Sequence, residues 1–121
     1  MSGPRLHGIR NCDTVARARA WLTEHGVAFD FHDFKVAGVP VERLDAWMGA
    51  VGWERLLNRK GTMWRRLPEA TRAGVVDAGS ARALMLVQPS VIKRPVVDWP
   101  DGTTTVGFDV EDFARRAGCP S

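Results

Sequence analysis

The sequence predicts an α/β fold, in which a mixed sheet of about four strands is flanked by helices and carries an all-helical insertion at about residues 40–88. Three observations predict it. Extended and helical patterns alternate over residues 1–40, only helical patterns follow, and two extended runs separated by a turn precede a final helix. A chain of 121 residues, 45% of them hydrophobic, can bury a core as a single domain over residues 1–121.

The amino-terminal part is predicted to form strand, helix, strand. Residues 5–9 are a short extended run, and residues 13–25 repeat apolar side chains at helical spacing up to Gly26, a residue type common just past helix ends. Residues 27–36 alternate aromatic and polar side chains, which predicts a second strand. A helical crossover joins parallel strands, so we expect these two strands to be parallel.

The middle of the chain is predicted to be entirely helical. Proline and serine are favoured at helix starts, and apolar residues recur at helical spacing between them. A break is expected at Gly61-Thr62, and Pro89 is expected to end the last helix near Gln88. The predicted helices begin at Pro40, Trp53, Pro68 and Ser80.

The carboxy-terminal part is predicted to be a hairpin followed by a helix. An extended run over residues 91–99 is interrupted by Pro95, a turn follows at residues 100–102, and a second extended run covers residues 103–108. A final helix is expected from about Asp109. This element order is that of a thioredoxin-like domain with a helical insert.

Composition narrows the class of protein. The net charge is +3 without any long run of like charge, so a nucleic-acid partner is not expected. No apolar stretch reaches the length of a membrane span, so no membrane partner is expected. The start lacks the apolar region of a secretion signal, so we expect a cytoplasmic protein. We also expect a monomer. The two cysteines and three histidines show no zinc-ligand spacing, so no metal is expected.

Cys12 is the candidate nucleophile. It lies where a predicted strand meets a predicted helix, and the unpaired N–H groups of a helix start favour a thiolate. A free cysteine is more often a small buried hydrophobe, but the neighbours Arg10, Asn11 and Asp13 are polar. Asp13 is a counter-signal, because a nearby carboxylate raises a thiol pKa.

No second cysteine stands within reach of Cys12 in a dithiol motif, because position 15 is Val15. Any redox cycle would therefore use an external thiol, most simply glutathione, or the distant Cys119. Cys119 is close to the end of the given chain, and we interpret it as incidental. His7, just before Cys12, is a conceivable base, although as a strand residue it is more often packed or exposed.

Two arginines are further candidates. Arg94 precedes Pro95 inside an apolar run, where a proline marks an edge, a bulge or a cis bond. Arg59 is expected at a helix end, where a cation suits the helix dipole. A guanidinium also binds oxyanions and carboxylates well, and spacing alone leaves open whether either arginine meets Cys12.

Several segments together resemble the arsenate reductase/Spx (ArsC-like) family, most closely its YffB branch. The resemblance covers about residues 5 to 115, and its most specific parts are the Asn-Cys-Asp-Thr turn and the Lys-Arg-Pro run. The segments are Gly8-Ile9-Arg10-Asn11-Cys12-Asp13-Thr14, Phe31-His32-Asp33-Phe34, Gly52-Trp53-Glu54, Leu56-Leu57-Asn58-Arg59-Lys60-Gly61-Thr62-Met63-Trp64-Arg65 and Ile92-Lys93-Arg94-Pro95.

The resemblance implies a thioredoxin-like fold with a helical insert, Cys12 as nucleophile, and an Arg94-Pro95 peptide that is cis and lies beside the cysteine. It implies that Arg59 and Arg94 bind an oxyanion, with Asn11 and Pro95 completing the substrate site. It further implies a glutathione-dependent thiol reductase, with glutathione as co-substrate and an oxidised thiol or an oxyanion such as arsenate as substrate. The alternative that it implies is a Spx-like module that binds RNA polymerase without turnover.

The chain departs from arsenate reductases proper at three places. Those enzymes have a third arginine after the hairpin turn, whereas residues 104–108 contain none. They have a histidine four residues before the cysteine, where this chain has Gly8, and a Cys-Gly-Thr-Ser loop, where this chain has Asp13 and Thr14 after Cys12. These departures favour thiol reduction over arsenate reduction.

Overall fold

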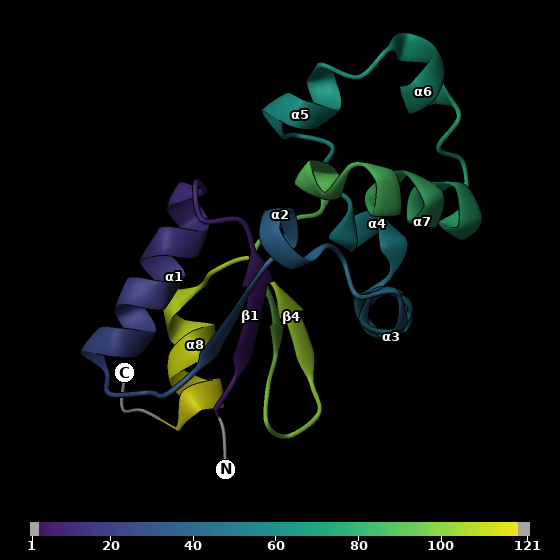
Figure 1. The fold of residues 1–121 in the computed structure, drawn as a ribbon. Helices are drawn as coiled ribbons and strands as arrows, with labels where there is room; N and C mark the ends of the chain where they lie inside the picture. Colours follow the sequence, from purple (N-terminus) through teal and green to yellow (C-terminus); the bar gives the residue numbers. More distant parts are fainter. Residues whose placement is uncertain (1–2, 119–121) are drawn as a thin grey trace. The chain divides into compact units, whose positions relative to one another are not determined.

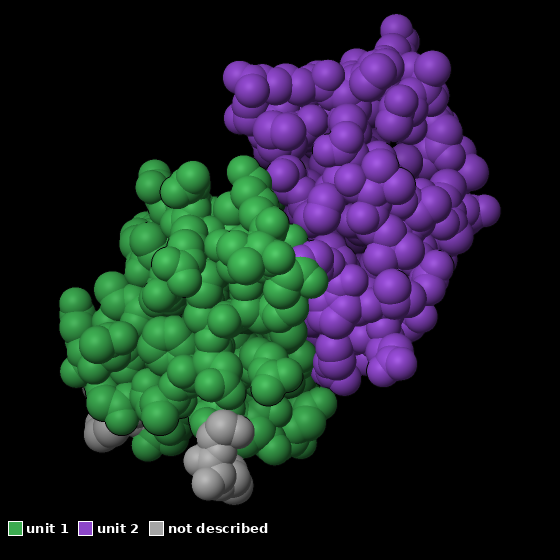
Figure 2. Space-filling view, viewed as in Figure 1, with its two compact units in different colours: residues 1–37, 94–121 green, residues 38–93 purple. Residues whose placement is uncertain are grey.

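The computed structural model describes residues 3–118, so Cys119 lies outside the described residues. The chain divides into two compact units, one made of residues up to 37 together with those from 94 onward, the other of residues 38–93. Figure 2 colours the two units. The elements in chain order are β1 (Arg5–Gly8), α1 (Asp13–Glu24), β2 (Asp30–Asp33), α2 (Phe34–Ala37), α3 (Val41–Val51), α4 (Trp53–Leu56), α5 (Thr62–Arg65), α6 (Glu69–Ala73), α7 (Ala78–Val87), the 3-10 turn η1 (Pro89–Val91), β3 (Val96–Asp98), β4 (Thr104–Val106) and α8 (Val110–Ala117).

The first unit contains a four-stranded mixed sheet of order β2-β1-β3-β4, as the sequence predicts. β1 runs parallel to β2 and antiparallel to β3, and β3 and β4 form the expected hairpin. Helices α1 and α8 cover one face of this sheet (Figure 1). The core between them contains Leu6, Ala18, Trp21, Leu22, Val97, Trp99, Phe113 and Ala114.

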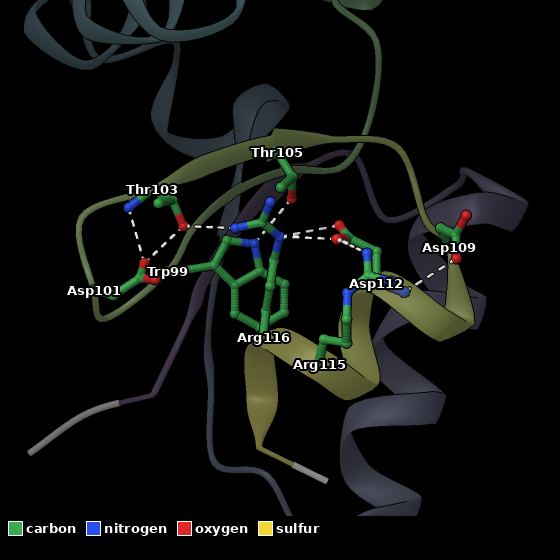
Figure 3. Close-up of polar contacts among 8 residues, drawn as sticks. All are labelled: Trp99, Asp101, Thr103, Thr105, Asp109, Asp112, Arg115 and Arg116. Atoms are coloured by element: carbon green, nitrogen blue, oxygen red, sulfur yellow. Dashed lines mark hydrogen bonds and ion pairs between the residues drawn. The ribbon is translucent and has the colours of Figure 1, made fainter. Parts of the chain in front are cut away.

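Helix α8 is joined to the hairpin by a hydrogen bond (Figure 3) and by ring packing. The Arg116 side chain donates to Thr103 Oγ1 at 2.9 Å and to Asp112 Oδ1 at 3.0 Å. Trp99 Nε1 donates to Thr105 Oγ1 at 2.9 Å, and the Trp99 ring meets Phe113 edge to face. The hairpin and the last helix of the described chain therefore form one block.

The second unit is helical throughout. Helix α3 packs against α4 and α7, and α4 also packs against α7. An antiparallel bridge pairs Leu57, directly after α4, with Ile92, near the end of this unit. The fully buried side chains of this unit include Leu44, Trp47, Leu56, Met85 and Ile92. This arrangement agrees with the predicted run of helices, although the bounds of individual elements differ.

Three of the predicted strands were too long. The strand expected over residues 27–36 is ordered as β2 only from Asp30 to Asp33, and the chain turns into α2 directly afterwards. The turn begins because Asp33 Oδ1 accepts the backbone N–H of Lys35 at 2.8 Å, a local contact that competes with the sheet ladder. The strands expected over residues 91–99 and 103–108 are likewise reduced to β3 and β4.

One predicted helix start was wrong, and one helix was not predicted. Ser80 does not cap α7: Asp77 does, and its Oδ1 accepts the N–H of Ser80 at 2.9 Å, while Ser80 Oγ accepts the N–H of Asp77 at 3.1 Å. Ser80 is thus the returning member of a capping box. The helices are interrupted before Thr62, as expected, and the additional short helix α5 begins there with Gly61 as its N-cap residue.

Candidate functional site

Cys12 lies at the junction of β1 and α1, in the sheet-containing unit. It is the N-cap residue of α1, with extended backbone angles (φ −110°, ψ 122°), and its side chain is half-buried. The junction forms because β1 ends at Gly8 and residues 10 and 11 turn the chain into the helix. The predicted nucleophile therefore stands at a helix start, as the sequence indicates.

The first turn of α1 is held against β1 by close packing. Val15 is fully buried, and a Cβ added at Gly8 would lie 2.8 Å from Val15 Cγ2, closer than real Cβ contacts. Glycine at position 8 lets the strand and the helix approach each other. A larger residue such as the histidine of arsenate reductases does not fit there without movement. Val15, the position of the second sulfur in a dithiol motif, is a core residue.

The surroundings of Cys12 lower its pKa below the ordinary value of 9.0. Burial by itself raises the pKa, but the backbone N–H of Val15, the charge and hydrogen bond of the Arg94 guanidinium, and the backbone N–H of Thr14 outweigh it. The thiol makes no full capping hydrogen bond to these N–H groups, so their effect is that of dipoles pointing toward the sulfur. The net effect favours the thiolate.

Arg94 and Pro95 approach this sulfur from the segment that leads into β3. The Arg94-Pro95 peptide bond is cis, as the resemblance implies, and Pro95 is buried. Pro95 O accepts the backbone N–H of Gly107 at 2.9 Å, and Val96 pairs with His7 of β1. The hairpin and the central strand thus fix the segment that presents the Arg94 guanidinium to Cys12.

Asn11 is an exposed turn residue directly before Cys12, and its role in substrate binding stays a prediction. Its neighbour Arg10 is exposed as well, with Nε 3.7 Å from Asp33 Oδ2 at the end of β2. Both polar side chains flank the nucleophile at the surface. No arginine occurs in β4 or directly after it, where arsenate reductases proper carry their third.

Arg59 belongs to the helical unit. Its guanidinium lies over the ring of Trp53, with Cζ 5.6 Å from the ring centroid, and its side chain is exposed. Its assignment as an oxyanion-binding residue stays a prediction. Three further cations of this unit, Arg55, Lys60 and Lys93, line the same pocket as Arg59. Sequence reasoning did not single them out, and Lys93 is far from the other three along the chain.

His7 is engaged in the sheet. It is 1% exposed, its Nε2 donates to Asp98 Oδ2 at 3.0 Å, and its ring packs near His32 and stacks on Phe34. Burial lowers the pKa of His7, and the Asp98 carboxylate only partly offsets this. The neutral imidazole is therefore favoured, and this ring has a structural place in the sheet.

The arrangement can perform nucleophilic chemistry at one sulfur. In the described part of the chain, no three His, Cys, Asp or Glu side chains gather as a metal ion would require. None of the helices described is long and apolar enough to cross a bilayer. What remains is a thiol with a lowered pKa, one guanidinium beside it and first-turn N–H groups that face it.

Comparisons with known proteins agree on one family. The ArsC family model matches residues 7–115. A solved YffB protein is 47% identical, with a TM-score of 0.87, over 94% of this chain and 98% of that one. An arsenate reductase-related protein from Brucella melitensis, solved in solution, is 50% identical, with a TM-score of 0.74, over 95% of this chain and 93% of that one.

Two sequence relatives complete the comparison. A Haemophilus influenzae protein is 33% identical over 108 residues, which are 89% of this chain and 93% of that protein. The global transcriptional regulator Spx of Streptococcus agalactiae is 26% identical over 89 residues, 72% of this chain and 64% of the regulator. With a family model that spans nearly all described residues, and with the cysteine and cis-proline where the resemblance requires them, this chain belongs to the ArsC family of arsenate reductase-related proteins with a thioredoxin-like fold.

Proposed function

We propose that the protein is a glutathione-dependent thiol-disulfide reductase that uses Cys12 as its single nucleophile. The Cys12 thiolate attacks the glutathione sulfur of a glutathionylated substrate, which forms a Cys12–glutathione disulfide and releases the substrate thiolate. A second glutathione thiolate attacks this disulfide, releases the Cys12 thiolate and leaves as glutathione disulfide. The proton of the second glutathione ends on the substrate thiol, so two glutathione units and one substrate balance.

One observation carries this proposal: the pKa of Cys12 is lowered despite burial, by Arg94 and by the N–H groups of Val15 and Thr14. The thiolate is the nucleophile in disulfide exchange, and a lowered pKa also makes Cys12 a good leaving group in the second step. The buried Val15 supports an external resolving thiol. A cytoplasmic setting supplies glutathione at the required reduction state.

In this proposal Arg94 stabilises the Cys12 thiolate and then holds a glutathione carboxylate. Asn11 and the cis Pro95 border the substrate beside the sulfur. Arg59 binds a second anionic group of the ligand, a carboxylate in thiol reduction or an oxyanion in arsenate reduction. These roles follow from the chemistry of the side chains and from the family resemblance.

The direct test is the pH dependence of Cys12 alkylation by iodoacetamide, with Cys119 changed to Ser so that one thiol reacts. We expect a midpoint below 9.0 in the parent protein and a higher midpoint in Arg94→Gln, because the guanidinium no longer favours the thiolate. Arg17→Gln is the matched control, since it removes the same charge from an exposed position of α1. An ordinary midpoint in the parent protein would contradict the proposal.

Turnover is tested with the mixed disulfide of cysteine and glutathione as substrate and glutathione as reductant. The parent protein should accelerate formation of glutathione disulfide, and a Cys12–glutathione adduct should be seen by mass spectrometry. Cys12→Ser should abolish both. Arsenate, offered in the same assay, should be a poor substrate, because residues 104–108 supply no arginine and Gly8 stands at the histidine position.

A second candidate function has one observation in its favour, the similarity to the Spx regulator. In this alternative the chain binds the α subunit of RNA polymerase and performs no turnover. Spx regulators usually carry a two-cysteine switch, and Val15 removes its second sulfur. Specific retention of the α subunit on the immobilised protein, together with no activity in the disulfide assay, would favour the regulator over the reductase.

A further inference from the structure

The part of the helical unit that contains α5 and α6 has no buried residue. Between the buried Leu57 and the buried Ala81, all of residues 58–80 are at least partly exposed. Helices α3, α4 and α7 of the same unit each bury at least one residue, whereas α5 and α6 bury none. Residues 62–76, the α5–α6 segment, therefore add surface to the helical unit without adding to its core.

Apolar side chains of the α5–α6 segment are open to solvent. Met63 is 38% exposed and Val76 is 73% exposed. Trp64, Leu67 and Val75 are only partly buried. Single exposed apolar residues are normal on a protein surface. A segment that holds five large ones and no buried residue, however, offers apolar area for a partner to cover.

Three arginines of the same segment have no carboxylate partner. Arg65, Arg66 and Arg72 form no ion pair with any of residues 3–118. In the same unit, by contrast, Arg82 Nε lies 2.6 Å from Asp45 Oδ1. Arg72 Nε is buried and has no hydrogen-bond acceptor in the described part of the chain. A carboxylate from another molecule would supply these guanidinium groups with the acceptors that the chain itself does not.

We propose that the α5–α6 segment is a docking surface for another protein, and that this partner contributes an acidic segment with an apolar side chain. Three arginines against the single acid Glu69 favour carboxylates. Arginine, methionine and tryptophan, which this segment combines, are residue types enriched at protein interfaces. The inference uses no property of Cys12 or Arg59, so it stands or falls separately from the proposed reductase.

A protein partner is favoured over a nucleic acid or a membrane. Helices α5 and α6 are four and five residues long. Neither is long enough to serve as a recognition helix in a DNA groove. Neither can present the extended apolar face with which an amphipathic helix lies in a membrane surface. A short acidic peptide segment needs only the few contacts that these residues offer.

The test uses the full chain with Cys12→Ser and Cys119→Ser, in which no thiol chemistry takes place. The probe is a short synthetic peptide with glutamates on both sides of a leucine, and backbone N–H resonances are followed by NMR as it is added. We expect saturable shifts at residues 62–76, with a dissociation constant on the order of 0.1 mM that rises with added sodium chloride. A peptide with glutamine in place of glutamate should bind at least about threefold more weakly.

One pair of double variants tests the charge of the segment. Arg65→Gln with Arg66→Gln should weaken binding at least about fivefold, because charge-assisted contacts are lost. Arg17→Gln with Lys35→Gln removes the same charge from exposed positions of the sheet-containing unit, and should change binding less than about twofold. Dispersed N–H resonances verify that each variant is folded.

A second pair tests the apolar part. Met63→Ser with Val76→Ser should weaken binding at least about threefold, because the partner then covers less apolar area. Val36→Ser with Val87→Ser is the matched control, since these valines are 81% and 76% exposed outside the segment, and it should change binding less than about twofold.

Several outcomes would overturn the proposal. They are the absence of saturable shifts at residues 62–76, equal binding of the glutamate and glutamine peptides, and equal losses in the variants and their controls. Tighter binding of a single-stranded oligonucleotide or of anionic lipid vesicles at the same residues would also overturn it, in favour of a nucleic acid or a membrane as the partner.

Discussion

Three helices of this protein begin in different ways. Helix α8 begins at Asp109, whose Oδ1 accepts the N–H of Asp112 at 3.1 Å, and α7 begins with the capping box of Asp77 and Ser80. Helix α1 begins at Cys12, and no side-chain oxygen caps it. The first two starts are closed by carboxylates of the chain itself, and the third presents its N–H groups to a sulfur.

The difference shows how stability and reactivity are divided in this fold. A carboxylate at a helix start satisfies otherwise unpaired N–H groups and stabilises the helix. Where Cys12 stands, the N–H dipoles of Thr14 and Val15 instead lower the pKa of a thiol. The start of α1 is fixed by packing, because Val15 is buried against Gly8. Packing, rather than a capping side chain, therefore fixes the start of α1.

The largest effect is expected when the Cys12 thiol is replaced by a capping carboxylate. Cys12→Asp should abolish disulfide reduction and raise the free energy of unfolding by about 1 kcal/mol, because aspartate caps helix starts well. Arg94 would stabilise the new carboxylate as it does the thiolate. Urea unfolding followed by circular dichroism measures the stability. Cys12→Ala, which loses both sulfur and cap, is the control, and equal stability of the two variants would contradict the prediction.

The packing that replaces a cap is tested at Gly8. Gly8→Ala should lower the free energy of unfolding by about 1–3 kcal/mol, because the added Cβ would meet Val15 Cγ2 at 2.8 Å. Gly49→Ala is the matched control: Gly49 lies inside α3 with no atom within 4 Å of an added Cβ, so this change should stabilise by about 0.5–1 kcal/mol. Both are measured by urea unfolding, and equal effects would show that Gly8 is not tightly packed.

The carboxylate cap at the start of α8 is tested at Asp109. Asp109→Ala should lower the free energy of unfolding by about 1 kcal/mol, because the N–H of Asp112 loses its acceptor. Asp109→Asn keeps an acceptor oxygen and should cost much less. A thermal melt of both variants beside the parent protein gives the comparison. Equal losses would mean that the charge, and not the cap, matters at this helix start.

A smaller effect is expected at His7, the buried histidine of the central strand β1. The pKa of His7 in the folded protein is below 6.5, so the unfolded chain binds more protons between that lowered pKa and 6.5, and stability falls as pH falls through this window. The groups that face the ring are Asp98, His32 and Arg5. The slope of unfolding free energy against pH should decrease in His7→Gln. Unchanged slopes from pH 7 to pH 5 would contradict the assignment.

The sequence predicts the architecture well because its patterns there are local. The helical period of α1, the position of Cys12 before it, and the turn of the hairpin are all set by neighbouring residues, and the structure has each of them. Asp77 was missed as a cap because Ser80 is an equally good cap by residue type. Only the extended backbone of Asp77 (φ −154°, ψ 180°) decides between the two.

The features that the sequence did not predict depend on contacts formed only in the folded chain. Nothing near Lys93 in the sequence indicates that it joins Arg55, Arg59 and Lys60, because the bridge from Leu57 to Ile92 pairs segments far apart along the chain. The early end of β2 was missed because a single contact from Asp33 to the N–H of Lys35 overrides the strand pattern of the residues that follow. The packing of Val15 on Gly8 likewise becomes visible only when α1 lies on β1.

That packing also limits how the protein could change over evolutionary time. A cysteine in place of Val15 would create the spacing of a two-thiol switch. The new sulfur would replace a fully buried side chain that lies against the central strand. Buried in apolar surroundings, it would ionise poorly and be out of reach of soluble reductants. A lineage could gain such a switch only by reshaping the contact between strand and helix first.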